Sequence, residues 1–459
     1  MMFSLILFLK NIRLPVSVGL LGCLLVAIAV PLRPAEARKL SFIRDAEIEN
    51  TIRTYATPVF VAAGLEPTAI NIYLVNDNTL NAFVAGGQKL FLNTGLLTKS
   101  ENASQVIGVI AHETGHISGG HLSRIRDAMK ASSAQSILAF VLGGAAIIGG
   151  RGDVGAAVIQ GGQELGNRNF LQYSRTQEGA ADAAAMKYLE ATGQSSRGLL
   201  EFFEILGDQE LMSVSRQDPY YRSHPLTRER VQAVENLVSK SAYSNIPESA
   251  DFAIRHRRMK AKLLAFLESP TYTFRRYQET DLSIESRYAR AIAYYRRGDL
   301  VHALPLIDGL IAEQPDDPYF HELKGQVLFE NGRNDEALPS YQKAATLNPK
   351  SSLLRRDLAR VQIEANNPAL LDQAIANLLA SIDQDRTDET SWRQLAIAYG
   401  RQGKIAESSL ALGEEALLQG NVKNAIYHAG RAEKLLPEGS RGWLQAQDML
   451  VAARNLNNK

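Results

Sequence analysis

Two histidines and a glutamate form the pattern with the clearest chemical meaning in this sequence. His112, Glu113 and His116 lie in the run His-Glu-Thr-Gly-His. On a helix the two histidines share one face, one turn apart, so both imidazoles can reach a single ion. Glu113 lies beside them, in position to take a proton from a water molecule activated by that ion. The run predicts a zinc site with a general base, although so short a motif also occurs by chance.

A catalytic zinc ion needs a third protein ligand and keeps a fourth position open. Glu178 and Asp182 follow downstream in the run Glu-Gly-Ala-Ala-Asp and, four residues apart, would share one helix face. We predict that Glu178 binds the metal. Asp182 would accept a hydrogen bond from the outer nitrogen of a ligand histidine and so fix its tautomer. The alternative is a solvated acidic face on an alanine-rich helix.

Two further histidines lie in the same part of the chain. His121 is five residues past His116 and nine past His112, so it points away from the ligand face, and we predict that it does not bind the metal. His224 precedes Pro225, which favours an extended, loop-like backbone. The residue itself leaves two roles open, because a histidine here can fill the fourth zinc position or stabilise the transition state.

Residues 38–255 are predicted to form the α+β domain that positions these side chains. The expected elements are a helix at 42–63, a strand at 70–75, a hairpin at 82–93 around Gly86 and Gly87, and helices at 104–130 and 174–191. The apolar, glycine-rich segment 137–162 is shorter than the ~20 apolar residues that cross a bilayer. We expect it to be a mobile lid or an interfacial contact, with a buried helix pair as the alternative.

The C-terminal part of the chain carries an internal repeat. After a helical connector at 256–283, the residues from 284 to 459 show a period near 34. The landmarks that recur at this spacing are Gly298 and Gly332, Ala303 and Ala337, and Pro315 and Pro349. Later units contain Ala359, Ala374, Trp392, Gly403, Gly420 and Pro437, with extra residues near Asn366. Such a period predicts an all-α solenoid of stacked helix pairs that resembles tetratricopeptide repeats, rather than a generic helical bundle.

The N-terminus has the features of a secretory signal peptide. Lys10 and Arg13 precede an apolar run from Leu14 to Leu32, and Ala35-Glu36-Ala37 follows it, so we predict cleavage after Ala37. An uncleaved membrane anchor and lipidation at Cys23 are the alternatives. Cys23 is the only cysteine, so the mature chain would reach an oxidising compartment without disulfides. The net charge of +1 provides no general basic field for nucleic acid.

Together these motifs resemble the HtpX/BepA group of zinc metallopeptidases, which are gluzincins. The resemblance is carried by His-Glu-x-x-His followed by Glu-x-x-Ala-Asp, and by three further elements: Asn81-Ala82-Phe83, Asn93-Thr94-Gly95-Leu96-Leu97 and Ser223-His224-Pro225. With the signal peptide and the repeats, the chain is most similar to the periplasmic BepA-like (YfgC-like) branch. The resemblance implies a zincin-type metallopeptidase domain with one Zn²⁺ per chain.

The same resemblance implies a function in the periplasm of a Gram-negative bacterium, with a peripheral location at the outer membrane as a further expectation. Unfolded or stalled outer-membrane proteins would be the substrates, and the repeats would bind the β-barrel assembly machinery. The enzyme would have a chaperone-like role, and His224 would act as a gate at the fourth zinc position. The alternatives are a chaperone or adaptor with a silent or gated protease, and a membrane-anchored protease of the HtpX type. No nucleic acid partner is expected.

Overall fold

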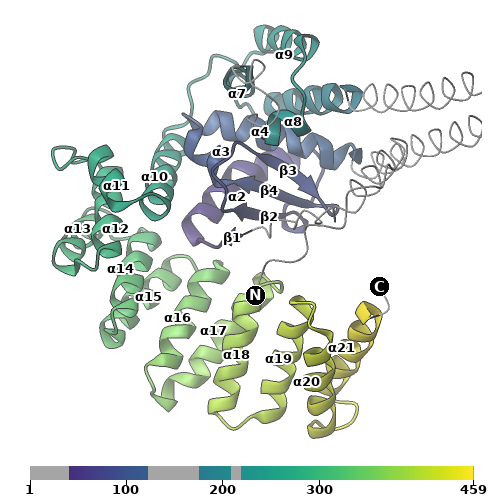
Figure 1. Cartoon of the computed structure of the whole chain (residues 1–459), viewed down its shortest axis with the longest axis vertical. Coiled ribbons are helices and arrows are strands. Elements are labelled where there is room, and N and C mark those ends of the chain that lie inside the picture. The colour runs from purple at the N-terminus through teal and green to yellow at the C-terminus, as the bar shows by residue number, and fades with distance from the viewer. Residues whose placement is uncertain (1–40, 122–174, 208–218, 458–459) are drawn as a thin grey trace, which may run out of the picture. The chain divides into compact units, whose positions relative to one another are not determined.

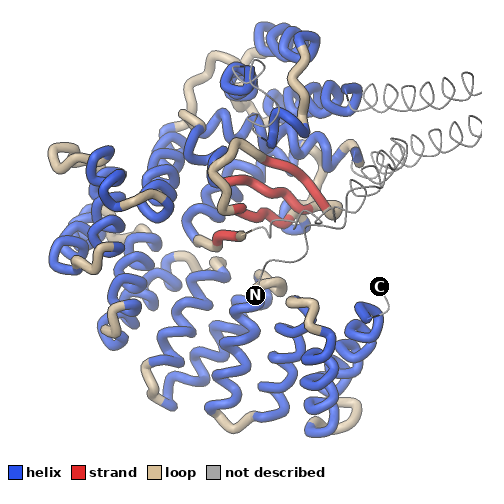
Figure 2. Tube along the Cα trace, viewed as in Figure 1, coloured by secondary structure: helices blue, strands red, loops and turns tan. Residues whose placement is uncertain are grey.

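The computed structural model of the chain describes residues 41–121, 175–207 and 219–457 (Figure 1). Residues Phe42–Lys459 cluster as one unit. The expected signal peptide, Cys23 and the segment 137–162 lie outside the described residues. Figure 2 shows that the strands gather in one small sheet and that most of the remaining described chain is helical.

A four-stranded mixed sheet forms the centre of the N-terminal region. Its strands are β1 (Phe42–Ile43), β2 (Asn71–Val75), β3 (Ala82–Ala85) and β4 (Lys89–Asn93), in the order β1-β2-β4-β3. β2 and β4 are parallel, and β1 and β3 are antiparallel to their neighbours. Gly86 and Gly87 have φ values of 56° and 93°, which glycine adopts without strain, so they make the β3–β4 turn. The predicted strand at 70–75 and hairpin at 82–93 are therefore confirmed.

The two faces of the sheet have different surroundings. Leu74, Leu90 and Leu92 are buried in the main core, whereas the aromatic rings stack on the opposite face, as alternation along a strand requires. On that face Phe91 lies 4.9 Å from Tyr73 and 4.7 Å from Phe83, ring centroid to ring centroid. The sheet thus has one face packed into the core and one lined by an aromatic row.

Three helices and a short 3₁₀ turn complete the first part of the domain. They are α2 (Ala46–Ala62), η1 (Pro67–Ala69), α3 (Thr94–Lys99) and α4 (Ala103–Ser118). The predicted helix at 42–63 therefore begins later than expected, because residues 42–43 pair with β2 as a strand. The side chain of Asp45 caps α2 by accepting a hydrogen bond from the amide of Ile48.

Helix α4 contains the His-Glu-Thr-Gly-His run and is almost wholly buried. Asn102 caps its start, and it ends at Ser118, before Gly120 with φ 63°. The prediction of one helix through 104–130 is wrong at this end, since two glycines in succession stop the helix. Residues 122–130 lie outside the described residues.

Four more helices follow α4 in the described part of the peptidase region. The chain is helical over 175–191, as predicted for 174–191, and then forms α7 (Arg197–Gly207), α8 (Pro219–Ser223) and α9 (Arg228–Lys240). Glycines on α4 permit the closest approaches. A Cβ atom on Gly115 would lie 2.8 Å from the carbonyl oxygen of Ala181, and one on Gly108 would lie 2.8 Å from the amide nitrogen of Leu199.

The C-terminal part of the chain is a series of helix pairs. After α10 (Ala250–Leu267) and α11 (Pro270–Arg276), the structure has α12 (Ile284–Arg296), α13 (Leu300–Glu313), α14 (Pro318–Glu330), α15 (Asn334–Leu347), α16 (Ser352–Glu364), η2 (Pro368–Leu370), α17 (Leu371–Gln384), α18 (Glu389–Arg401), α19 (Ile405–Leu418), α20 (Val422–Leu435) and α21 (Arg441–Asn457). Gly298 and Gly332 follow the first helix of two successive pairs with φ values of 74° and 75°. Ala303 and Ala337 are fully buried in the second helices.

The extra residues that the sequence places near Asn366 form η2, which confirms the irregular third repeat. Helix α10 crosses residue 255, where the sequence places the end of the peptidase domain. The exact domain limits stay a prediction.

A buried charged cluster ties α2 to α10 and to the first repeat. Glu47 on α2 lies 2.8 Å from Arg258 and 3.3 Å from Lys262, both on α10, and accepts a 2.8 Å hydrogen bond from the hydroxyl of Tyr288 on α12. Arg258 also binds Asp317, next to α14, at 2.5 Å. The peptidase region and the first repeats are therefore joined by polar contacts as well as by the apolar contacts around α10.

Candidate metal centre

Four buried side chains converge at one point in the N-terminal region. Each of His112, His116, Glu178 and His224 offers a ligand atom, and these atoms all lie within 4.8 Å of one another. The Nε2 atoms of His112 and His116 are 3.1 Å apart. Each also lies 3.4 Å from a carboxylate oxygen of Glu178. Helix α4, the 175–191 helix and the residue that follows α8 thus bring together donors that are far apart in the sequence.

The donor set fits a divalent metal ion. Imidazole nitrogens with one carboxylate are the ligands that zinc takes in catalytic sites. Burial disfavours the protonated ring of His112, but Asp182 and Glu178 outweigh this effect and raise its pKa to about 10. Without a metal the ring therefore carries a second proton, on Nε2 facing Glu178, in the place that a bound metal ion would take. Both carboxylate oxygens of buried Glu113 lack a hydrogen-bond partner among the described residues, as expected where a polar reactant belongs.

Asp182 lies behind the first histidine. Its Oδ1 is 2.9 Å from Nδ1 of His112, so the ring can donate this outer proton and leave Nε2 facing Glu178. The structure thus places Glu178 beside the donor atoms and Asp182 behind a histidine, and their roles as ligand and positioning group stay predictions. Burial would raise the pKa of Asp182, but hydrogen bonds from His112 and Arg230 hold it below its ordinary value.

Arg230 is a part of the site that sequence reasoning missed. This side chain on α9 is 5% exposed and forms two hydrogen bonds to Asp182, of 2.7 and 2.9 Å. Its Nη1 lies 3.0 Å from Glu178 and donates to the carbonyl oxygens of His224 and Pro225, at 3.3 and 2.9 Å. One guanidinium thus connects the acidic helix to the backbone that carries His224.

Little in the sequence marks Arg230, because it is one of 50 basic residues. The available signal is its position: Thr227 caps α9 and places Arg230 in the first turn, six residues after His224.

His224 is held by two neighbours. Its ring stacks on Tyr220, with centroids 4.4 Å apart and an interplanar angle of 20°, and its Nδ1 lies 2.9 Å from the hydroxyl of Ser223. Nε2 is 3.5 Å from a carboxylate oxygen of Glu113. Burial lowers the pKa of His224 to about 4, so the ring is neutral at pH 7 and can offer a lone pair.

His121 is not among the four converging residues, but it does contact one of them. Its Nδ1 lies 2.9 Å from Nδ1 of His116, and both rings are buried. Helical geometry indicates only that His121 faces away from the ligand face. The turn at Gly119 and Gly120 brings its ring back to His116, which that geometry does not predict.

Glu113 lies beside the donor set without joining it. Burial raises its pKa to about 7, and the nearby charge of Glu178 acts in the same direction. A carboxyl group with a pKa near 7 can both accept and return a proton at neutral pH. The arrangement suits a hydrolytic reaction in which Glu113 first accepts a proton and later returns it.

Comparison with known proteins places this centre in a region that is similar to a peptidase family. Residues 43–238 match peptidase family M48, and residues 288–352 and 328–396 match tetratricopeptide repeats. The "Beta-barrel assembly-enhancing protease" of Yersinia pestis is 24% identical over 422 residues, which cover 91% of this chain and 85% of that protein. The protein of the same name from Escherichia coli K12 is 24% identical over 87% of this chain and 81% of its own length.

A shorter relative matches the peptidase region. "Metalloprotease LoiP" of Escherichia coli K12 is 28% identical over 195 residues, which cover 42% of this chain and 72% of that protein. Residues 43–238 therefore form a metalloprotease domain of peptidase family M48, and tetratricopeptide repeats follow it in the same chain.

Proposed function

We propose that the chain is a periplasmic, zinc-dependent endopeptidase that acts on unfolded or stalled outer-membrane β-barrel proteins and supports their assembly. The observation that carries the enzymatic part is the convergence of His112, His116 and Glu178 beside the buried Glu113. The substrate class rests on the similarity to proteases that are named for β-barrel assembly.

In the proposed mechanism the three side chains hold one Zn²⁺. When bound, the ion polarises the scissile carbonyl and makes the attacking water more acidic. Glu113 removes a proton from that water and delivers it to the leaving amine. Asp182 keeps the ring of His112 in the tautomer that leaves Nε2 free, and Arg230 holds Asp182 in place.

The substrate would bind as an added strand. β3 is at one end of the strand order, so one of its edges has no partner strand among the described residues, and it packs against α4. An extended peptide can pair with such an edge and bring one carbonyl to the metal. Stalled barrel proteins have unpaired strands, which suit this mode of binding.

We propose that His224 restrains the enzyme by occupying the fourth position on the metal. Its position in the converging group and its neutral ring support this role. Replacing His224 with alanine should then raise basal cleavage or cause self-cleavage, with no loss of zinc. If His224 instead stabilises the oxyanion, the same change should slow cleavage by roughly 10²–10³-fold, so the two roles predict opposite signs.

The test of the main proposal combines metal analysis with a cleavage assay. Wild-type protein should contain one zinc per chain and cleave casein or an unfolded barrel protein. The Glu113→Gln variant should keep both zinc and fold but lose cleavage, because the base is removed and no ligand is. Wild-type cleavage by this variant would exclude Glu113 as the base, and sub-stoichiometric zinc in folded, zinc-supplemented protein would exclude the metal site.

The proposed location depends on cleavage after Ala37, which N-terminal sequencing of the mature protein tests. A mature N-terminus at Arg38 supports release into the periplasm, whereas an intact N-terminus supports the membrane anchor. None of the helices in the described ranges has the length and apolar character needed to cross a bilayer.

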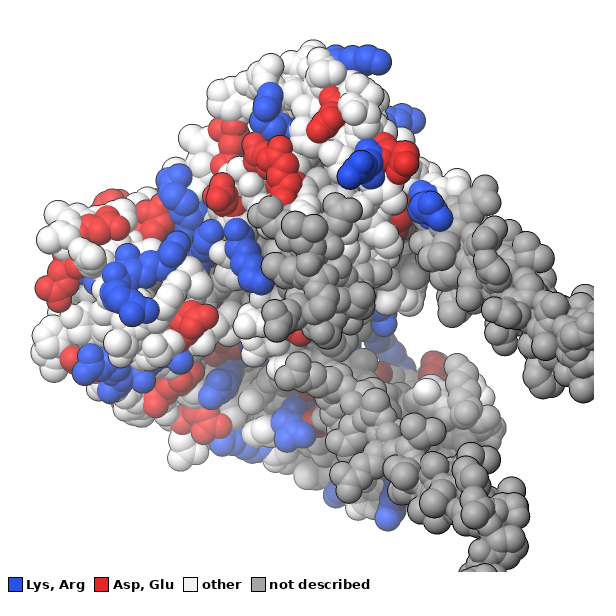
Figure 3. Space-filling model, turned by 45° about the horizontal axis from the view of Figure 1, so that its top comes forward, with Lys and Arg blue, Asp and Glu red and all other residues white. Residues whose placement is uncertain are grey.

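Basic and acidic side chains are interspersed on the face in Figure 3, as the near-neutral composition implies. We assign the contact with the assembly machinery to the repeats, which stack into extended surfaces.

A further inference from the structure

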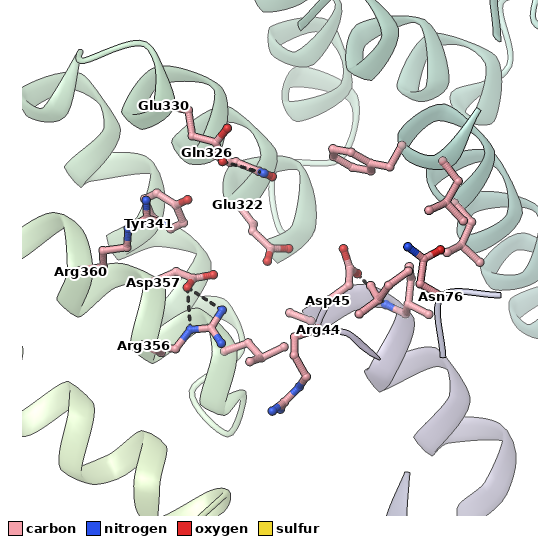
Figure 4. Close-up of a pocket in the computed structure, with 17 residues that line it drawn as sticks. Arg44, Asp45, Asn76, Glu322, Gln326, Glu330, Tyr341, Arg356, Asp357 and Arg360 are labelled. Atoms are coloured by element: carbon pink, nitrogen blue, oxygen red, sulfur yellow. Dashed lines mark hydrogen bonds and ion pairs between the residues drawn. The ribbon is translucent and has the colours of Figure 1, made fainter. Parts of the chain in front are cut away.

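A cavity of about 370 Å³ lies where the start of α2 and the end of α10 meet helices α14, α15 and α16 (Figure 4). All the residues that line it belong to the unit Phe42–Lys459. It is separate from the metal centre, and none of the four converging residues lines it. Its volume falls at the lower end of the roughly 300–1,000 Å³ range of small-ligand pockets.

One carboxyl oxygen in this cavity lacks a hydrogen bond within the described chain, although a lysine forms a long ion pair with it. Glu322 on α14 is 9% exposed, and its Oε2 has no hydrogen-bond partner among the described residues. The nearest cation with a recorded contact, Nζ of Lys262, is 3.8 Å away, beyond hydrogen-bond distance. Lys262 is already bound by Asp45 at 2.9 Å and by Glu47 at 3.3 Å. A buried, unsatisfied oxygen is costly, and once Glu322 is ionised the cavity favours a ligand that can donate to it.

The other charged groups of the cavity have partners. Arg356 pairs with Asp357 at 2.9 Å, and Arg44 pairs with Asp385 at 2.9 Å. The guanidinium of Arg360 lies over the ring of Phe329, 4.6 Å from its centroid. The three cations are therefore engaged with acidic or aromatic groups, and Glu322 is left as the acceptor that faces the opening.

Apolar side chains from β1, α2, α10 and α16 also line the cavity. Figure 4 shows Glu322 reaching from the repeats toward Asp45 across the opening. The aliphatic and phenylalanine side chains of the lining are Ile43, Ala46, Ile48, Leu263, Phe266, Leu267 and Leu353. An apolar wall beside one unpaired carboxylate matches a side chain with an aliphatic stem and a cationic end.

We propose that this cavity is a binding site for a lysine or arginine side chain of an extended polypeptide, whose cationic group binds Glu322. The stem would lie against the apolar wall, and the ammonium or guanidinium group would donate to Oε2 of Glu322. The site would give the junction of the peptidase and repeat regions a preference for basic segments, independently of the metal centre.

The test measures binding of Thr-Val-Thr-Lys-Thr-Val-Thr-amide, labelled with fluorescein at its N-terminus, to the full-length Glu113→Gln chain at pH 8.5. The substitution at Glu113 prevents cleavage, so the result does not depend on the proposed peptidase activity. The lysine peptide should bind about tenfold or more tightly than the same peptide with norleucine, as expected for a charge-assisted hydrogen bond. Adding Glu322→Gln should remove this preference, whereas adding Glu336→Gln, at an exposed position on α15, should keep it.

Equal binding of the lysine and norleucine peptides would overturn the proposal, as would a lysine preference that survives Glu322→Gln. Tighter binding of a glutamate peptide would overturn it in favour of an anion site. Free cadaverine tests the source of the cation: competition at the affinity of the lysine peptide would identify a small amine, not a polypeptide, as the ligand. Circular dichroism and a thermal melt establish that each variant is folded.

Discussion

Glu178 and Asp182 share one helix face, yet their surroundings give them different tasks. Glu178 lies among the histidine Nε2 atoms, whereas Asp182 lies behind His112 and against Arg230. Chemically similar carboxylates are thus separated into a candidate ligand and a positioning group by one turn of helix. Replacing Glu178 should therefore remove a metal ligand, whereas replacing Asp182 should only weaken metal binding.

The first prediction concerns Asp182. Replacing it with asparagine should weaken zinc binding by roughly 10–100-fold, because the ring of His112 loses the acceptor that fixes its tautomer. Competition with a chelator measures the affinity, and Asp251→Asn, at an exposed position on α10, serves as the control. Zinc affinity equal to that of the wild type would show that Asp182 does not position the ligand.

The second prediction concerns the pH dependence that Glu322 confers. Burial raises its pKa to about 8; Lys262 opposes this shift, while Asp45, Asp357 and Glu47 add to it. Between about pH 4.5 and 8 the folded chain holds a proton that the unfolded chain releases, so this contribution to stability is lost as the pH rises.

Thermal melts from pH 5 to 9 measure this effect. Glu322→Gln should remove this pH-dependent loss of stability. The melting temperature of the variant should therefore rise relative to that of the wild type as the pH increases. Parallel pH profiles of the two proteins would contradict this assignment.

At the scale of whole elements, the spacing between helices determines where the donor atoms lie. Gly115 on α4 allows the 175–191 helix to approach until the carbonyl oxygen of Ala181 would lie 2.8 Å from an added Cβ. Glu178 is carried by that helix, one turn before Ala181. Separating the two helices would therefore also move Glu178 away from His112 and His116.

The third prediction tests this spacing with a matched pair of glycines. Gly115→Ala should destabilise the protein by about 1–3 kcal/mol through overpacking and should weaken zinc binding. Gly179→Ala is the control, because an added Cβ there meets no atom within 4 Å and should be neutral or slightly stabilising. Chemical denaturation and zinc affinity provide the two readouts. Equal behaviour of both variants would refute the role of the close approach.

Most elements could be predicted from periodicity, but some boundaries could not. The 34-residue spacing predicts the helix pairs, and Gly86-Gly87 predicts the hairpin, because both depend on local patterns. The short strand β1 depends on pairing with β2, a tertiary contact that residues 42–43 do not reveal. The role of Arg230 likewise depends on where α9 packs, not on any motif that contains it.

At the scale of the whole molecule, ionic contacts link the peptidase region and the repeats. Glu47 precedes Arg258 and Lys262 by more than 200 residues, so the sequence alone does not bring them together. Burial would raise the pKa of Glu47, but Arg258 and Lys262 hold it below its ordinary value. The contribution of Glu47 to stability is therefore present at neutral pH and is lost as the pH falls below its ordinary range.

The fourth prediction follows from this cluster. Glu47→Gln should lower the free energy of unfolding by about 3 kcal/mol at pH 7, because it leaves buried cations with fewer partners. Glu285→Gln, which removes a pair with the exposed Arg257, should change it by less than about 1 kcal/mol. Denaturant titration measures the free energy of unfolding of both variants. Equal decreases would show that the buried cluster stabilises the protein no more than the exposed pair does.

The converging donors also have a consequence for the unfolded chain. His116 and Glu178 are 62 residues apart, and His224 follows 46 residues later, in a sequence whose single cysteine allows no internal disulfide. One ion shared by these side chains, as proposed, would act as a reversible cross-link that closes two long loops. In a disulfide, a loop of this length is associated with roughly 4 kcal/mol of lost chain entropy. The ambient zinc concentration would therefore set the free energy of unfolding of this chain, as redox potential does for disulfide-bonded proteins.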